Sequence, residues 1–105
     1  MNVNRRLKLQ AELEALLGSK HVYFQPPESI KLQFPCYIYK YERPDVTRAD
    51  DTIYSLYDRY QLTYITKSPV DPLINETLYH FGSLISQDTS FTKDNLNHYI
   101  FSIYY

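Results

Sequence analysis

The sequence predicts a small α+β domain in which an antiparallel β-sheet carries two α-helices packed on one face. Two segments, one at the N-terminus and one after residue 71, repeat apolar residues at the three- and four-residue spacing of an amphipathic helix. In other segments two kinds of side chain alternate along the chain, as on the two faces of a strand, and these segments are rich in tyrosine, a strong strand former. The order of helix, strands, helix, strands lacks the regular strand–helix alternation of a parallel α/β sheet.

Length and charge limit the architecture and the partners. A chain of 105 residues has room for one core, so we predict a single domain over residues 1–105. The net charge of −1 disfavours nonspecific binding to nucleic acid or to an anionic membrane, because both need a basic excess. No apolar run approaches the roughly 20 residues of a membrane span, and the charged N-terminal segment does not resemble a signal peptide.

The first predicted helix covers residues 2–17. Its apolar stripe contains Val3, Leu7, Leu13, Leu16 and Leu17. Asn2 or Asn4 can cap its start, and Gly18 suits the left-handed residue that often ends a helix.

Basic residues precede acidic residues in this helix, an order that opposes the helix dipole. The basic residues are Arg5, Arg6 and Lys8. We therefore expect these three side chains to face an acidic partner.

Three strands are predicted between the helices. A short strand at 22–25 ends at Pro26 and Pro27, because proline cannot continue strand pairing. The segment 36–42 alternates Cys36, Ile38 and Lys40 with Tyr37, Tyr39 and Tyr41. Residues 43–51 are predicted to form a loop, since they contain a proline and five charges without apolar periodicity. The longest strand is predicted at 53–66.

A second helix and a hairpin complete the predicted fold. Asp71 and Pro72 form a favourable cap and first turn for a helix over 72–85. Its apolar stripe contains Leu73, Ile74, Leu78, Phe81 and Ile85. Residues 90–92 then lead through a turn at Asp94–Asn95 into a final strand.

The residues that usually carry chemistry are scattered. His21, His80 and His98 lack the spacing of metal ligands. Cys36, the only cysteine, lies on a predicted strand without a neighbouring base, so we expect it to fill the core, and its lack of a disulfide partner favours a reducing compartment. Two glycines cannot build a glycine-rich phosphate loop. We predict no catalytic residue, no metal site and no cofactor.

Tyrosine is the most unusual feature, with 12 tyrosines against five phenylalanines and no tryptophan. Sheet formation explains about half of them. The others exceed what a small core can hold, and exposed aromatic stripes usually mark protein interfaces. The candidate contacts are Tyr37, Tyr39, Tyr41, Tyr104 and Tyr105. Base stacking is disfavoured, because acidic Glu42 and Asp45 lie beside the stripe.

The predicted loop at 43–51 carries charges of both signs, which suits contacts that fix the register between subunits. The candidate residues are Arg43, Asp45, Arg48, Asp50 and Asp51.

Two stretches together resemble a known family. They are VYFQPPESIKLQFPCYIYKYE at 22–42 and FTKDNLNHYIFSIYY at 91–105, and LLGS at 16–19 and YDRYQLTYIT at 57–66 fit the same pattern. The sequence resembles the small tail-terminator, or tail-completion, proteins of long-tailed phages and prophages of Gram-positive bacteria. It departs from the family after Pro69, where we expect a shorter and less apolar connection than the helix predicted over 72–85.

The resemblance implies an assembly role without catalytic residues. Related proteins form a ring, commonly a hexamer, that caps the tail tube, stops its polymerisation and presents a surface for joining the head. The implied partners are copies of the chain, the tail-tube protein and head–tail connector proteins. The implied location is the head-proximal end of the virion tail, after synthesis in the bacterial cytoplasm.

One alternative function remains open on the sequence. Basic Arg5, Arg6 and Lys8 near a tyrosine-rich sheet are also compatible with a connector component or small regulator that contacts nucleic acid. Salt-sensitive DNA binding would distinguish this alternative from a pure assembly protein.

Overall fold

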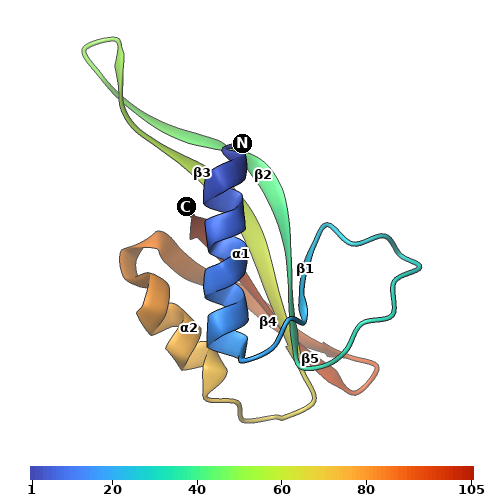
Figure 1. The fold of residues 1–105 in the computed structure, drawn as a ribbon. Coiled ribbons are helices and arrows are strands. Elements are labelled where there is room, and N and C mark those ends of the chain that lie inside the picture. The colour runs from blue at the N-terminus through green and yellow to red at the C-terminus, as the bar shows by residue number, and fades with distance from the viewer.

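The computed structural model describes residues 1–105, apart from the side chain of Tyr54. In chain order its elements are α1 (Val3–Leu17), β1 (Val22–Phe24), β2 (Cys36–Ala49), β3 (Thr52–Thr66), α2 (Leu73–Phe81), the 3-10 helix η1 (Gly82–Leu84), β4 (Ile85–Lys93) and β5 (Leu96–Tyr104). The strands form one sheet in the order β1-β2-β3-β5-β4. Both α-helices cover the same face of this sheet (Figure 1). The predicted α+β class is therefore confirmed.

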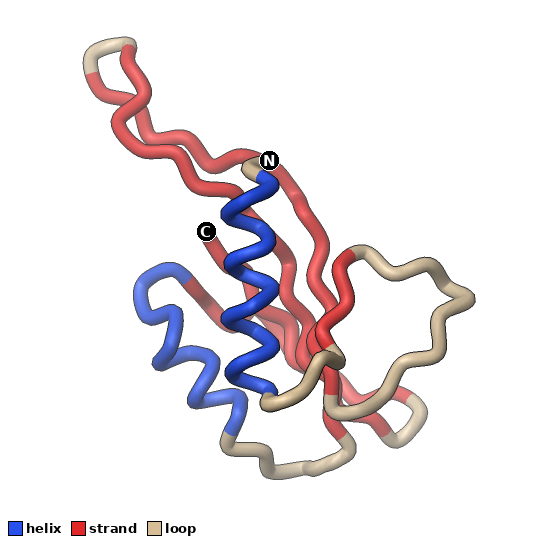
Figure 2. The backbone as a smooth tube through the Cα atoms, in the orientation of Figure 1, coloured by secondary structure: helices blue, strands red, loops and turns tan.

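One strand pair departs from the antiparallel arrangement. β1 lies parallel to β2, with Val22 opposite Tyr37 and Phe24 opposite Tyr39, while the other three pairs are antiparallel. A parallel pair needs a crossover connection, usually a helix. Here the connection is the non-helical segment 25–35, which returns the chain to the same end of the sheet (Figure 2). The sequence contains no helix at this place, so its pattern predicted an antiparallel neighbour.

The largest boundary correction concerns residues 43–51. They do not form a loop, because β2 continues to Ala49 and the chain turns only at Asp50 and Asp51. Both turn residues have positive φ angles, 51° and 63°. Two-residue hairpin turns require such angles, and aspartate tolerates them better than most residues. The hairpin of β2 and β3 is therefore much longer than predicted.

The second helix is shorter than predicted, at Leu73–Phe81 rather than 72–85. Gly82 has a φ of 57°, a left-handed value that interrupts the helix. The chain enters β4 at Ile85, whose side chain still lies against the core. Ile85 fitted the predicted apolar stripe because it also packs against the core, although it does so from the first position of β4 and not from a helix.

Other local predictions are confirmed. The Asn2 side chain accepts a hydrogen bond from the Arg5 amide at 3.1 Å and caps α1. Gly18 ends α1 with a φ of 77°, and its amide bonds to the Glu14 carbonyl. Asp94 and Asn95 form the turn between β4 and β5, with φ angles of 55° and 63°.

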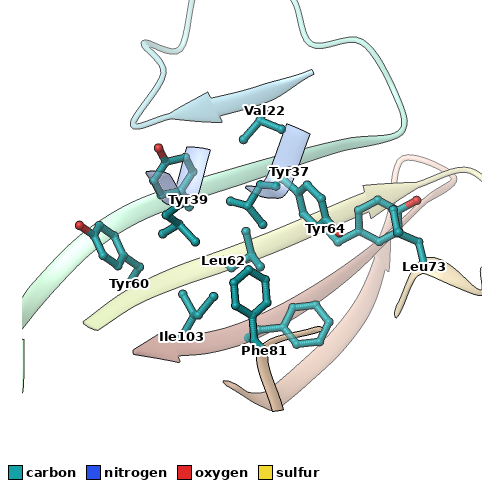
Figure 3. Packing of buried hydrophobic residues seen from close by; sticks show 12 residues of the cluster. Val22, Tyr37, Tyr39, Tyr60, Leu62, Tyr64, Leu73, Phe81 and Ile103 are labelled. Atoms are coloured by element: carbon teal, nitrogen blue, oxygen red, sulfur yellow. The ribbon is translucent and has the colours of Figure 1, made fainter. Parts of the chain in front are cut away.

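The core lies between the helices and the covered face of the sheet (Figure 3). Leu9 and Leu13 point into it from α1, and Leu73 and Phe81 from α2. The strands contribute Val22, Tyr37, Tyr39, Tyr60, Leu62, Tyr64, Phe101 and Ile103. Four of these eight side chains are tyrosines, so the core is unusually rich in hydroxyl groups.

Asp71 fixes the start of α2. Its carboxylate accepts hydrogen bonds from the Leu73 amide at 3.0 Å, the Tyr64 hydroxyl at 2.6 Å and the Thr66 hydroxyl at 3.0 Å. Burial alone would raise the pKa of this carboxyl, but the hydrogen bonds outweigh it and hold the pKa below its usual value.

The first prediction concerns the packing of α1. Leu13→Ala should lower the free energy of unfolding by about 2–5 kcal/mol, because it leaves a cavity at a fully buried position. Leu7→Ala is the matched control on the same helix, since Leu7 is 51% exposed, and it should change the free energy by less than about 0.5 kcal/mol. Urea unfolding of both variants measures the difference. Equal losses would contradict the observed orientation of α1.

The second prediction concerns acid stability. The folded pKa of Asp71 lies below the unfolded value of about 3.9, so the stability from its ionised form is present above pH 4 and disappears as the pH falls through the folded pKa. Asp71→Asn should lower the free energy of unfolding by about 1–3 kcal/mol at pH 7. It should also flatten the decline between about pH 5 and pH 2.

Urea unfolding across this pH range tests the second prediction. Tyr64→Phe removes one of the three hydrogen-bond donors to Asp71. It should therefore produce a smaller loss of stability at pH 7 and a smaller flattening of the pH profile than Asp71→Asn. Parallel pH profiles for Asp71→Asn and the unsubstituted protein would show that Asp71 is not the group responsible.

Candidate self-association surfaces

The distal half of the β2–β3 hairpin projects from the rest of the molecule (Figures 1 and 2). β1 pairs with β2 only as far as Tyr39, and β5 pairs with β3 only from Arg59 to Thr66. Residues 43–57 therefore form a two-stranded ribbon that pairs with no third strand. We call this ribbon the arm. This projection accounts for the elongated extents of 50 × 26 × 23 Å.

The arm exposes large apolar side chains. Val46 and Leu56 lie directly opposite each other on the two strands and are 37% and 50% exposed. Ile53, opposite Arg48 near the tip, is 55% exposed. An isolated two-stranded hairpin is only marginally stable in water. A ribbon with these side chains is therefore a surface that gains stability from a partner.

The charged residues predicted at 43–51 all lie on the arm. Arg43, Arg48, Asp50 and Asp51 are exposed, and Asp45 is partly buried. The loop conformation predicted for them is wrong for Arg43, Asp45 and Arg48, which lie on β2, and holds only for Asp50 and Asp51, which form the turn. Their spacing along a ribbon instead distributes both signs of charge from its base to its tip.

A groove of about 610 Å³ lies between the loop that follows β1 and the sheet face that the helices leave open. Its loop wall contains Pro26, Pro27, Glu28, Ile30 and Leu32. Its floor comes from Ile38 and Lys40 on β2 and from Gln61 and Thr63 on β3, which pair with them. The groove is mainly apolar, with Glu28 and Lys40 as its charged lining residues.

The central tyrosine prediction is wrong for two residues. Tyr37 and Tyr39 are 0% and 1% exposed, so they belong to the core and cannot contact another subunit. The Tyr37 hydroxyl lies 2.6 Å from Thr77 Oγ1 on α2, and the Tyr39 hydroxyl donates to Gln10 on α1 at 2.6 Å. Burial raises the pKa of Tyr37 to about 12. The alternation of β2 was recognised correctly, but the tyrosine face points inward.

Of the other candidate tyrosines, Tyr41 and Tyr105 lie at the edge of the core, whereas Tyr104 lies on the open face of the sheet. Tyr41 packs edge-on against Tyr60, with the ring centroids 5.6 Å apart. Tyr105 donates a hydrogen bond to Glu12 on α1. Tyr104 lies near the Arg59 guanidinium, at 5.8 Å from the ring centroid. All three are partly buried, so each has an intramolecular role before any partner binds.

The basic residues of α1 face aromatic rings instead of an acidic group. The Arg6 guanidinium lies 4.4 Å from the Phe24 ring centroid and also donates to the Tyr39 hydroxyl at 3.0 Å. Arg5 lies 5.9 Å from the Tyr105 ring centroid. Aromatic ring faces attract cations, which explains the placement of these charges without an acidic partner. Lys8 is exposed.

The histidines and the cysteine occupy separate places. His80 lies 3.1 Å from Glu12, and His98 stacks on Phe91 with ring centroids 4.6 Å apart. Cys36 is fully buried, and burial raises the pKa of its thiol to about 12, so the thiol is unreactive at neutral pH. Among the residues that the structure describes, no three His, Cys, Asp or Glu side chains are grouped as a metal site.

A polar network lies on the open face of the sheet. Arg59 donates to Ser102 at 3.1 Å, and Ser102 donates to Asp88 at 2.6 Å. Glu42 lies 3.6 Å from Arg59 Nε. The network connects β2, β3, β5 and β4, so these charges stabilise the sheet and do not form a separate binding site.

The arm and the groove were not predicted from the sequence. The signal for the arm was present, because strand-favouring Val46 and Thr47 precede Asp50–Asp51 and Thr52 and Ile53 follow. The density of charge outweighed this signal. The groove had no signal in the sequence, since its two walls meet only when the loop after β1 lies beside β2 and β3.

Within the described part of the chain, neither α1 nor α2 combines the length and the apolar character of a membrane-spanning helix. Comparisons with protein-family models, curated proteins and solved structures found no match to this chain.

The third prediction distinguishes two buried tyrosines. Thr77 donates to the Leu73 carbonyl, so the Tyr37 hydroxyl must donate to Thr77, and Tyr37→Phe should cost about 0.5–1.5 kcal/mol of stability. The Tyr60 hydroxyl is buried and has no hydrogen-bond partner among the described atoms. Tyr60→Phe should therefore leave the free energy of unfolding unchanged or raise it. Urea unfolding tests both, and a larger loss for Tyr60→Phe would contradict the structure.

Proposed function

We propose that the protein is a structural subunit and not an enzyme, and that its copies form a ring that caps the tail tube of a long-tailed phage. The ring ends tail-tube polymerisation and presents the surface for joining the head. The resemblance to phage tail-terminator proteins, which commonly form hexamers, supplies the ring assembly. The single observation that supports self-association is the arm, which exposes apolar side chains outside the core.

The arm is suited to assembly because it lies at one end of an elongated molecule (Figure 1). A ring requires each copy to present two different surfaces, one for each neighbour. A projecting ribbon that docks elsewhere on the next copy meets this requirement. The charges along it, of both signs, suit a contact with one register.

The buried tyrosines change which residues support this function. Tyr37 and Tyr39 hold the helices to the sheet, so the proposal no longer depends on them. Val46, Ile53 and Leu56 replace them as the apolar contact residues.

The nucleic-acid alternative has no observation in its favour. That alternative rested on three basic side chains of α1. Two of them, Arg5 and Arg6, already contact aromatic rings of the same chain. We therefore propose the assembly role alone.

The fourth prediction concerns particles assembled without the protein. Deleting its gene from the phage genome should give overlong or unjoined tails in electron micrographs, with a loss of infectivity. A plasmid copy of the gene should restore normal tails, and antibody labelling should then locate the protein at the head-proximal end of the tail. Normal tail length and full infectivity after deletion would overturn the proposal.

The same complementation assay can test the arm. Ile53→Asp places a charge at an exposed apolar position of the arm and should fail to restore normal tails. Tyr79→Ala is the control, because Tyr79 is 87% exposed on α2 and should complement fully. Folding of both variants is verified by circular dichroism.

A further inference from the structure

We infer that the arm of one copy docks into the groove of a second copy, between the loop that follows β1 and the open face of the sheet. The inference rests on the proposed function, which requires copies to contact one another. It goes further by assigning the two surfaces that meet. The contact is made by different surfaces on the two copies.

A copy cannot place its arm in its own groove. The floor of the groove is formed by β2 and β3 at Ile38, Lys40, Gln61 and Thr63. The arm is the continuation of these same two strands in the direction away from the loop that follows β1 (Figure 2). Its seven residues from Arg43 to Ala49 span roughly 23 Å at about 3.3 Å per residue. A paired ribbon does not fold back over this length, so the arm that fills the groove comes from another copy.

The apolar side chains of the two surfaces are complementary. The arm presents Val46, Ile53 and Leu56 to solvent. The groove presents two prolines, Ile30, which is 41% exposed, and Leu32 beside Ile38. Contact between them removes apolar area from water on both copies. It also supplies the support that a two-stranded ribbon lacks on its own.

The charges are complementary as well. Glu28 and Lys40 are the charged residues of the groove lining, one acid and one base. The tip of the arm carries one base, Arg48, followed by the acids Asp50 and Asp51. Pairing Arg48 with Glu28, and the turn acids with Lys40, places opposite charges together in one orientation of the arm. The reverse orientation places like charges together.

The exposed edge of β4 is a weaker candidate for the docking site. A register shift between Gln87 and Thr89 interrupts its pairing with β5, and Asp88 and Lys93 add charges. Irregularities and charges of this kind block edge-to-edge pairing. The groove does not depend on edge pairing, and its two charges, on Glu28 and Lys40, have opposite charges available on the arm.

The contact between arm and groove has a consequence for assembly. Since the arm and the groove are different surfaces, each copy uses its arm on one neighbour and its groove on the other. Such contacts continue from copy to copy and close into a ring when the rotation between copies permits.

The fifth prediction uses paramagnetic relaxation in the full-length protein. A nitroxide label is attached to Ala49→Cys, an exposed arm position whose substitution keeps every charge. The native Cys36 is fully buried and does not take the label. The labelled protein, at natural isotope abundance, is mixed with a nitrogen-15 copy. Backbone amides of residues 28–32, 38–40 and 61–63 in the nitrogen-15 copy should lose peak intensity, even if the contact is brief.

Two controls make the expected result specific. A label at Ala15→Cys, an exposed position on α1, should leave the groove amides unchanged. Glu28→Arg in the nitrogen-15 copy should reduce the effect of the arm label. Adding Arg48→Glu to the labelled copy should then restore it, because the two reversed charges pair again.

The pattern of intensity loss shows whether the arm docks into the groove. Intensity loss in the groove that Glu28→Arg weakens and the double reversal restores supports it. Intensity loss along β4 or α1, or no intensity loss at the highest soluble concentration, overturns it. A contact at another surface leaves the proposed ring intact with a different interface. Groove docking together with normal tails after gene deletion would instead overturn the tail function alone.

Discussion

The apolar core between the helices and the sheet holds the subunit together, and three tyrosine hydroxyl groups within it fix where the two helices lie on the sheet. Tyr39 reaches Gln10 on α1, Tyr64 reaches Asp71 at the start of α2, and Tyr37 reaches Thr77 within α2. A buried tyrosine contributes apolar area, but its hydroxyl also needs a polar partner. The helices must therefore lie where polar side chains meet these hydroxyls. A core of leucine or phenylalanine would impose no such condition.

This inward use of tyrosine leaves other surfaces for partners. The helix face of the sheet is filled, and Arg5 and Arg6 lie over its aromatic edge. The arm lies beyond the region where β1 and β5 flank the central strands, and the groove lies on the open face of that region. Self-association in our proposal therefore uses aliphatic side chains and charges, while the aromatic side chains maintain the subunit itself.

Local sequence signals predicted most of the elements. The caps of α1, the start of α2 and the turn at Asp94–Asn95 each depend on one or two residues with a strong backbone preference. The candidate site was predicted less well. The charged residues at 43–51 do lie outside the core, but Tyr37 and Tyr39 are buried in it. Alternation along a strand separates two faces without indicating which face is covered.

By itself, the sequence determined the α+β class, the two helices and the position of nearly every strand, because periodicity and turn residues act over short distances. Only the tertiary structure decided three features: the parallel pairing of β1, the inward direction of the tyrosines, and the extension of β2 and β3 into an arm. Each depends on contacts between residues far apart in the chain. The hydroxyl of Tyr37 on β2, for example, bonds to Thr77 on α2, 40 residues later in the chain, and no local sequence pattern predicts a contact over that separation.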